Sequence, residues 1–326
     1  MSTANPAAPG ASSVARTPTP IILDCDPGHD DALAMLLALA RPEVRLLGVT
    51  TVCGNATLEN TTRNALAVLT LIGRTDVPVA AGADRPLRGE LRTAPHVHGV
   101  SGIEGAELPA PAAEPVAEDA VEFIARHVAE GDEPITLVPT GPLTNIALFR
   151  ARHPDLFARV AHICLMGGSI GEGNITASAE FNIWVDPEAA AAVFDGGRPV
   201  TMVGLDVTHQ AIVTLADAER MESFGNRTGR VFADLLRYFA RFHVNRYGWS
   251  GSPIHDAVAV AHVLGLGLVE TRPYRVDIET EGRLTRGRTV VDLHAISGRP
   301  ANADVGVIID RPRFVNMLLE AVARFP

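Results

Sequence analysis

The sequence contains no lysine, and all 28 basic residues of its 326 are arginine. This absence excludes mechanisms that need a lysine amine, such as Schiff-base and pyridoxal-phosphate chemistry, the P-loop and kinase-type phosphoryl transfer. Positive charge is scarce overall, since the formal net charge is −10 and the isoelectric point is near 5.5. Nucleic acids and anionic membranes attract basic surfaces. The composition therefore disfavours both as partners and favours a small neutral or cationic ligand.

Cysteine and long apolar runs are also scarce. The three cysteines, Cys25, Cys53 and Cys164, each lie in or beside an apolar, strand-like segment. An odd number at this spacing predicts reduced core residues rather than disulfides or a zinc site. No apolar run reaches membrane-spanning length, and the first twenty residues lack the charged start and apolar centre of a signal peptide. We expect a cytoplasmic location.

Apolar runs alternate with helical patterns after a tail of Ala, Ser, Thr and Pro over residues 1–19, which we expect to be disordered. Strands are expected at 20–25, 44–52, 134–139, 161–166 and 199–204, with helices at 30–41, 57–73, 142–151 and 186–195. Closely spaced strands near 274–280, 289–294 and 305–309 then precede a last helix at 312–324. This order predicts an α/β fold, an open, mainly parallel (mixed) sheet with helices on both faces. Without a repeat or linker, residues 20–326 are expected to form a single domain.

The densest chemical signal is a cluster of acids that follows the first expected strand. Four carboxylates fall within eight residues: Asp24, Asp26, Asp30 and Asp31. Pro27-Gly28 predicts a turn between them, so the acids gather at a strand-to-helix corner. Carboxylates so close repel one another unless a hard, oxygen-seeking cation neutralises them, and calcium suits such a site. A solvated acidic turn with an Asp helix cap is the alternative, and four acids around one turn disfavour it.

Further polar segments follow other expected strands, at the sheet edge where α/β proteins bind ligands. They are Cys53 to Thr57, Pro139 to Asn145, and Met166 to Ser169 leading into Gly173 to Asn182. Further along, Pro253 to Ala257 repeats the pattern of an acid next to a turn. Pro142 has no N–H, so a carbonyl in its turn can be left for a ligand or metal. The Gly167-Gly168 segment is only a weak phosphate-binding signal, because its spacing is not G-x-G-x-x-G. Asp256 is a candidate fifth carboxylate, although a His-Asp pair is more commonly a helix start with a surface histidine.

Together these segments resemble a known family. The opening Asp24-x-Asp26-Pro-Gly-x-Asp30-Asp31-Ala32 is similar to the signature of the calcium-dependent nucleoside hydrolases, the inosine-uridine-preferring family. The likeness continues through Gly54 to Thr57, His98-Gly99, Pro139 to Asn145, Met166 to Gly168, Asn174 to Asn182 and His255-Asp256. The resemblance implies hydrolysis of the N-glycosidic bond of ribonucleosides to ribose and free base. It also implies a homodimer or homotetramer.

The resemblance implies a calcium ion held by the carboxylates of Asp26, Asp31 and Asp256 and by the backbone carbonyl of Thr140. The 2′- and 3′-hydroxyls of the sugar would complete its shell, and Asp26 would also act as general base on a metal-bound water. A vicinal diol suits calcium better than magnesium, because magnesium holds its waters tightly. The residues and the resemblance thus point to the same ion.

The resemblance also implies a set of sugar contacts. Asp30, Asn55 and Asn182 would bind the 2′- and 3′-hydroxyls, Asn174 and Glu180 the 5′-hydroxyl, and Met166 and Phe181 would lie near the sugar. Taken alone, Asn55 and Asn174 would be interpreted as turn residues and Met166 as core. Breaking the glycosidic bond builds positive charge on the ribosyl ring, and surrounding oxygens stabilise that charge in the transition state.

The departing base benefits from a proton. The resemblance implies His255 as the acid, assisted or replaced by His98, because an imidazole titrates near neutral pH. A helix expected over 228–247 places Phe239, His243 and Tyr247 on one face, at four-residue spacing. By position these three resemble the family's base contacts, and the alternative is an aromatic stripe in the core.

The base preference expected from these side chains is a tolerant or pyrimidine-leaning one, with uridine, inosine or cytidine as substrates. Two other classes remain open. A haloacid-dehalogenase-like phosphatase also starts with Asp-x-Asp, but it needs Thr or Val where this chain has Gly28, and a later lysine. A non-catalytic calcium- or sugar-binding protein would keep the residues that bind the ion and the sugar but would not turn over a substrate. The presence of both Asp26 and His255 argues against it.

Overall fold

A twisted central sheet dominates the computed structural model, which describes residues 17–326. Its strands are β1 (Thr19–Cys25), β2 (Val44–Thr51), β3 (Val79–Ala81), β4 (Thr136–Pro139), β5 (His162–Met166), β6 (Val200–Val203), β9 (Val269–Ile278), β10 (Thr289–Asp292) and β11 (Ala303–Ile309). Most of the tail predicted over 1–19 lies outside the described residues, and Thr19 already belongs to β1.

The strand order within residues 17–326 is β10-β9-β11-β6-β5-β4-β1-β2-β3. Pairing is parallel from β3 across to β11, whereas β9 runs antiparallel to both β11 and β10. This confirms the predicted open, mainly parallel mixed sheet. Because the parallel strands all end at one edge, the polar segments that follow β1, β2, β4 and β5 meet there.

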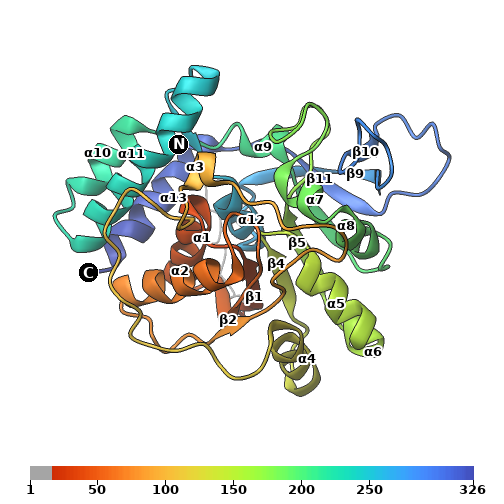
Figure 1. The fold of residues 1–326 in the computed structure, drawn as a ribbon, viewed down its shortest axis with the longest axis horizontal. Helices are drawn as coiled ribbons and strands as arrows, with labels where there is room; N and C mark the ends of the chain where they lie inside the picture. Colours follow the sequence, from red (N-terminus) through yellow and green to blue (C-terminus); the bar gives the residue numbers. More distant parts are fainter. Residues whose placement is uncertain (1–16) are drawn as a thin grey trace, which may run out of the picture.

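Helices cover both faces of the sheet (Figure 1). They are α1 (His29–Ala40), α2 (Leu58–Leu71), α3 (Pro95–His98), α4 (Ala120–Glu130), α5 (Thr144–Arg152), α6 (Pro154–Phe157), α7 (Phe181–Val185), α8 (Pro187–Phe194), α9 (Leu205–Thr208), α10 (Leu215–Glu222), α11 (Arg227–Tyr247), α12 (His255–Val263) and α13 (Arg311–Arg324). Between α9 and α12, β7 (Ile212–Thr214) pairs antiparallel with β8 (Gly251–Pro253) in a separate two-stranded sheet. None of the helices in residues 17–326 is long and apolar enough to cross a membrane.

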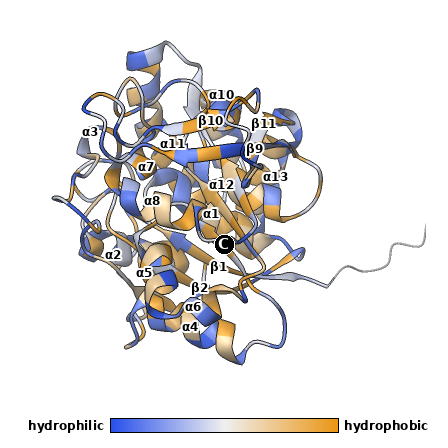
Figure 2. Cartoon of the chain, turned by 90° about the vertical axis from the view of Figure 1, so that its right-hand side faces the viewer, coloured by the Kyte–Doolittle hydropathy of each residue, from blue (hydrophilic) through white to orange (hydrophobic). Residues whose placement is uncertain are grey.

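The alternation of side chains along β1 explains the two layers. Leu23 packs into one hydrophobic core with α1, α2, α11, α12 and α13, while its neighbour Ile22 packs into the other with α4, α5 and α8. Hydrophobic colouring is concentrated on the central strands and the helices against them, and the outer loops carry much of the hydrophilic colour (Figure 2). Both faces of the sheet are therefore buried, as parallel sheets require.

Helix α1 is buried around its whole circumference. Of its twelve residues only Leu39 is partly exposed, and the helix packs against α12 and α13 as well as β2. This environment explains why the run from Ala32 to Ala40 is apolar on every side. The same packing holds the polar first turn, His29 to Asp31, in a fixed place below the sheet edge.

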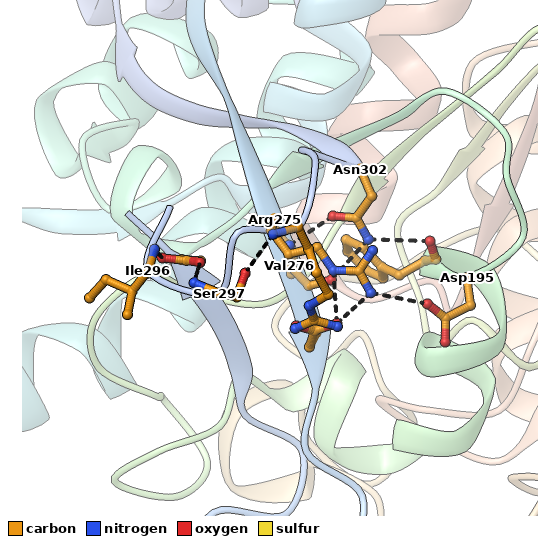
Figure 3. A network of polar contacts seen from close by, with 10 residues as sticks. Asp195, Arg275, Val276, Ile296, Ser297 and Asn302 are labelled. Atoms are coloured by element: carbon orange, nitrogen blue, oxygen red, sulfur yellow. Dashed lines mark hydrogen bonds and ion pairs between the residues drawn. The ribbon is translucent and has the colours of Figure 1, made fainter. Parts of the chain in front are cut away.

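A polar network fastens the antiparallel edge of the sheet (Figure 3). The side-chain amide of Asn302 exchanges two hydrogen bonds with the backbone of Val276, at 2.7 and 2.9 Å. Arg275 contacts Asp277 at 2.6 Å and Asp195, which follows α8, at 3.5 Å. These contacts tie β9 to the segment after α8 and hold the outer strands against the rest of the fold.

Candidate active site

The turn between β1 and α1 sets the position of Asp31. The Gly28 N–H donates to one carboxylate oxygen of Asp31 at 2.9 Å, which satisfies a backbone donor at the start of the helix. The Thr140 hydroxyl, in the loop after β4, donates to the other oxygen at 2.9 Å. Asp31 is thereby oriented from two different strand ends.

Four carboxylates converge at this corner. Oxygens of Asp30, Asp31 and Asp256 lie within 4.8 Å of one another, and all three residues are buried. Asp26 accepts a hydrogen bond from the Asn55 N–H at 2.6 Å through Oδ2. Its Oδ1 is buried without a partner in residues 17–326. A buried carboxylate oxygen left unpaired is costly, so the corner calls for a positive ligand.

Burial is the largest cause that raises the pKa of each of these acids. The pKa of Asp30 rises to about 8, with the charge of Asp31 as the second cause. The pKa of Asp26 and that of Asp256 rise well above the usual range, again with neighbouring aspartates contributing. A bound cation would oppose these shifts, because it favours the charged form of each carboxyl.

Two glycines allow the backbone to approach Asp26 closely. A Cβ added at Gly141 would lie 2.7 Å from Asp26 Oδ1, and one at Gly54 would overlap its Oδ2. The corner is thus shaped around Asp26, and its donors are all oxygens. This donor set fits a hard divalent cation rather than a thiophilic or imidazole-seeking one. The predicted ligand Thr140 belongs to the same corner, where its carbonyl accepts from the Asn182 amide at 2.7 Å.

A pocket opens above the corner. It is lined by the predicted residues Asp30, Asn55, His98, Thr140, Met166, Asn174, Glu180, Phe181, Asn182, Phe239, His243, Tyr247, His255 and Asp256. Asp26 and Asp31 are buried beneath the lining. Both accept hydrogen bonds from Asn55, Asp31 also accepts one from the Thr140 hydroxyl, and Asp26 lies next to Gly141. The structure therefore brings together residues that lie more than 200 positions apart in the sequence.

The side of the pocket formed by the loop after β5 is held by buried polar groups. Glu180 caps α7, and its carboxylate accepts from the N–H groups of Gly168 and Asn182 at 2.9 Å each. Burial raises the pKa of Glu180 to about 7. Asn174 accepts from the Phe181 N–H at 2.9 Å, so it shapes the loop as a turn residue while also lining the pocket.

The histidines differ from the expectation that they titrate near neutral pH. Burial lowers the pKa of His255 and of His98 well below the ordinary histidine value. It lowers the pKa of His243 to about 4. The Nδ1 atom of His255 lies 2.7 Å from the hydroxyl of Thr208 at the end of α9. Each of these shifts favours the neutral form of the ring at pH 7.

Aromatic rings from α11 form the opposite wall. Phe239 and His243 are buried in the packing, and Tyr247 is 39% exposed at the rim. The three residues line the pocket together. The helical spacing thus correctly predicted that the three side chains share one face. Phe239 and His243 are also core residues, which agrees with the alternative of an aromatic stripe in the core.

Comparison with known families settles what kind of protein this pocket belongs to. Residues 21–316 match the inosine-uridine preferring nucleoside hydrolases. The chain belongs to this family. It is an enzyme that hydrolyses the N-glycosidic bond of ribonucleosides. The phosphatase and the non-catalytic binding protein are thereby rejected.

Similar proteins cover almost the whole chain. The pyrimidine-specific ribonucleoside hydrolase RihA of Shewanella sp. (strain ANA-3) is 51% identical over 305 residues, which is 93% of this chain and 96% of that protein. RihA of Escherichia coli O9:H4 (strain HS) is 49% identical over 92% of this chain and 97% of its own length. The purine-preferring ribonucleoside hydrolase of Gardnerella vaginalis has 34% identity and a TM-score of 0.88, covering 94% of this chain and 98% of that chain.

Several residues of this nucleoside hydrolase pocket were missed by the sequence reasoning: Ala94, His96, Val97, Ile175, His209 and Phe242. His209 lies after β6 and α9, and it packs edge-on against His255 with ring centres 5.7 Å apart. Its position beyond a strand end is the signal that could have identified it. Trp249 stacks on Tyr247 at 4.6 Å but follows the end of the helix, so helical spacing does not reveal it.

Proposed function

We propose that this nucleoside hydrolase acts preferentially on pyrimidine ribonucleosides, with uridine and cytidine ahead of inosine, by direct attack of water with inversion at C1′. The observation that carries the reaction is the carboxylate corner at the pocket, where Asp30, Asp31 and Asp256 cluster and Asp26 is close enough to interact with Asp30 and Asp31. The base preference rests on relatives named pyrimidine-specific that are about half identical to this chain.

The ion of the corner is proposed to be calcium, held by Asp26, Asp31, Asp256 and the Thr140 carbonyl. A calcium ion there would supply positive charge that lowers the pKa of a water and binds the vicinal diol of ribose. Asp26 is the proposed general base, because its Oδ1 lacks a partner in the described structure and can accept the proton of the attacking water.

The ribose is proposed to lie over the corner. Asp30, Asn55 and Asn182 would bind its 2′- and 3′-hydroxyls, and Asn174 and Glu180 its 5′-hydroxyl, with Met166 and Phe181 against the ring. Asn182 is well placed for this role, since its amide nitrogen is already used by the Thr140 and Met166 carbonyls at 2.7 and 3.2 Å. Because the nitrogen is used in this way, the amide oxygen is left to accept a hydrogen bond from a sugar hydroxyl.

His255 is proposed to assist departure of the base. If the Thr208 hydroxyl donates to Nδ1, the neutral ring carries its proton on Nε2, the nitrogen left for the pocket. Nε2–H then donates to the base as negative charge develops on it. Phe239, His243 and Tyr247 would contact the base from the wall formed by α11.

The organisation of the protein is also proposed. Residues 20–326 would form one catalytic domain, and copies would associate as a homodimer or homotetramer. Apolar side chains exposed near the edge strand β10, namely Val290, Leu293 and Ile296, supply surface for such contacts. A cytoplasmic location agrees with three buried, unpaired cysteines. Sedimentation velocity and cell fractionation would test these statements.

A nucleoside panel tests the function. Release of reducing sugar from uridine, cytidine, inosine, adenosine and guanosine should give the largest kcat/KM for uridine and cytidine. Activity confined to adenosine and guanosine would overturn the base preference. Detection of the α-anomer of ribose by NMR immediately after cleavage of a β-nucleoside would support inversion.

A further inference from the structure

Two buried histidines contact each other, and one of them lines the pocket. The Nδ1 atoms of His29, at the start of α1, and His98, at the end of α3, lie 3.0 Å apart. The other nitrogen of His29, Nε2, lies 2.7 Å from the backbone carbonyl oxygen of Glu104. His98 lines the pocket, whereas His29 does not.

The positions of the protons follow from these two distances. A carbonyl oxygen can only accept, so His29 Nε2 must carry a proton and donate it to Glu104. Neutral His29 then has a lone pair on Nδ1, and His98 must donate its own Nδ1–H across the 3.0 Å contact. A neutral imidazole carries only one N–H proton, so His98 Nε2 is left with a lone pair. Burial, which lowers the pKa of His98, keeps that ring neutral.

The arrangement is built into the fold. The loop after α3 returns to the end of the helix, with the Glu104 N–H donating to the His98 carbonyl at 3.1 Å, so α3 and the loop after it supply both partners of His29. The His29 ring stacks nearly parallel on Phe239, with centres 5.1 Å apart. Gly28 leaves room for the pair, because a Cβ there would lie 2.6 Å from His98 Nδ1. The rings therefore have little freedom to exchange partners.

From this geometry we infer that His29 is a positioning residue that fixes His98 as a hydrogen-bond acceptor, whose Nε2 receives an N–H group of the nucleobase. The inference rests on the proposed function. Its ligand is a base edge rather than a sugar hydroxyl, because the His98 ring packs against Phe239 of the aromatic wall, with centres 5.2 Å apart. The N3–H of uracil and the amino group of cytosine are donors of this kind.

The two pocket histidines then have opposite roles. With the Thr208 hydroxyl donating to its Nδ1, as proposed above, His255 has a proton to offer, whereas His29 leaves His98 with a lone pair. In this inference His98 accepts a hydrogen bond from the base, which differs from the assisting proton donor that the sequence resemblance implied. A site that presents one donor and one acceptor discriminates between bases, since a mismatched edge leaves a buried polar group unpaired.

The tautomer of His98 can be measured without any substrate. In ¹⁵N-histidine-labelled protein, long-range ¹H–¹⁵N spectra at pH 7.5 should show His98 with protonated Nδ1 and unprotonated Nε2. His29→Phe keeps the stacked ring but removes the acceptor, so it should shift His98 toward the Nε2–H form. His29→Gln should retain the original tautomer, because its amide offers both an acceptor and a donor. His98 in the Nε2–H form in the unaltered protein would overturn the inference even if a variant failed to fold.

Kinetics test the ligand. His29→Phe should raise KM for uridine roughly tenfold with little change in kcat, because a base contact is present in both ground and transition states. N3-methyluridine lacks the N3–H donor, so His29→Phe should change its KM much less. Each substrate is compared between the variant and the unaltered enzyme, so the steric cost of the methyl group cancels. His29→Gln should restore KM. An equal KM change for both substrates, or a loss confined to kcat, would overturn base recognition by His98.

Tyr238→Phe serves as the matched control. Tyr238 also stacks near His29 and donates to the Glu104 carboxylate at 3.1 Å, but it takes no part in the proton chain. This variant should leave the His98 tautomer unchanged. Failure of the unaltered enzyme to hydrolyse any pyrimidine nucleoside would refute the proposed substrate preference, whereas the tautomer measurement tests the positioning role independently.

Discussion

The side-chain amide of Asn182 donates to the backbone carbonyl of Thr140 at 2.7 Å, and this bond joins the proposed sugar site to the proposed calcium site. The two residues come from different strand ends, after β5 and after β4. A sugar hydroxyl bound by Asn182 therefore lies beside the group that would hold the ion. Substrate binding and ion binding are expected to depend on each other.

We expect catalysis to require calcium through Asp26, Asp31 and Asp256. Removing the ion with a chelator should abolish ribose release from uridine, and added calcium should restore it. Asp26→Asn, which keeps the shape of the side chain, should lower kcat by several orders of magnitude, because it removes both a ligand charge and the base. Asp76→Asn, at the exposed surface, is the control. Full activity of verified metal-free enzyme would contradict this expectation.

Deoxynucleosides should be very poor substrates. Loss of the 2′-hydroxyl leaves Asp30 and Asn182, which are 5% and 6% exposed, without their proposed partner. Sites built to bind a hydroxyl reject the analogue that lacks it by roughly 10⁴-fold. The measurement is kcat/KM for uridine and 2′-deoxyuridine under the same calcium concentration. Comparable values would show that the sugar site is misassigned.

His255→Ala should slow uridine hydrolysis by roughly 10²-fold or more, the usual scale of help from a positioned proton donor. Nitrophenyl riboside has a good leaving group that needs no proton, so its hydrolysis should be much less affected. Thr208→Val should give a milder loss on uridine, because the ring remains but its orienting hydroxyl is gone. Equal damage to both substrates in His255→Ala would argue against the donor role.

The stability of the protein should fall as the pH is lowered through the range in which unfolded histidines gain protons. Buried His243 has a pKa of about 4, below the unfolded value of about 6.5, so its contribution is fully present above pH 6.5 and is lost toward pH 4. The loss amounts to at most about 3 kcal/mol for this residue. Denaturant titrations of the unaltered protein and His243→Gln should show a difference that shrinks from pH 7 to pH 5. A constant difference would exclude this linkage.

Sequence patterns predicted the fold well where elements were long. The apolar run of α1 and the strands at the centre of the sheet begin and end within a few residues of expectation. The strands β3 (Val79–Ala81), β7 and β8 have three residues each, too few to show a periodic pattern. Helix α4 (Ala120–Glu130) was missed although its Asp119 cap accepts from the Val121 N–H in the expected manner.

The candidate site was predictable where its chemistry lies in a dense local motif, as for Asp26 and Asp31. His29 belongs to that same motif, yet its role depends on a partner 69 positions away. The titration of His98 and His255 was predicted wrongly, because burial rather than residue type sets their pKa. Local sequence carries no measure of burial at a site assembled from separate strand ends.

Because α1 is buried around its whole circumference, the two ends of the pocket differ in how well they can tolerate substitutions. We expect the amide hydrogens of buried α1 to exchange only when the core opens, so the carboxylate end of the pocket should be rigid. The end of α11 beside Tyr247 is partly exposed and borders solvent. We therefore expect that selection or engineering can alter the choice of base at the rim of α11 with little effect on the carboxylates Asp30 and Asp31 at the start of α1.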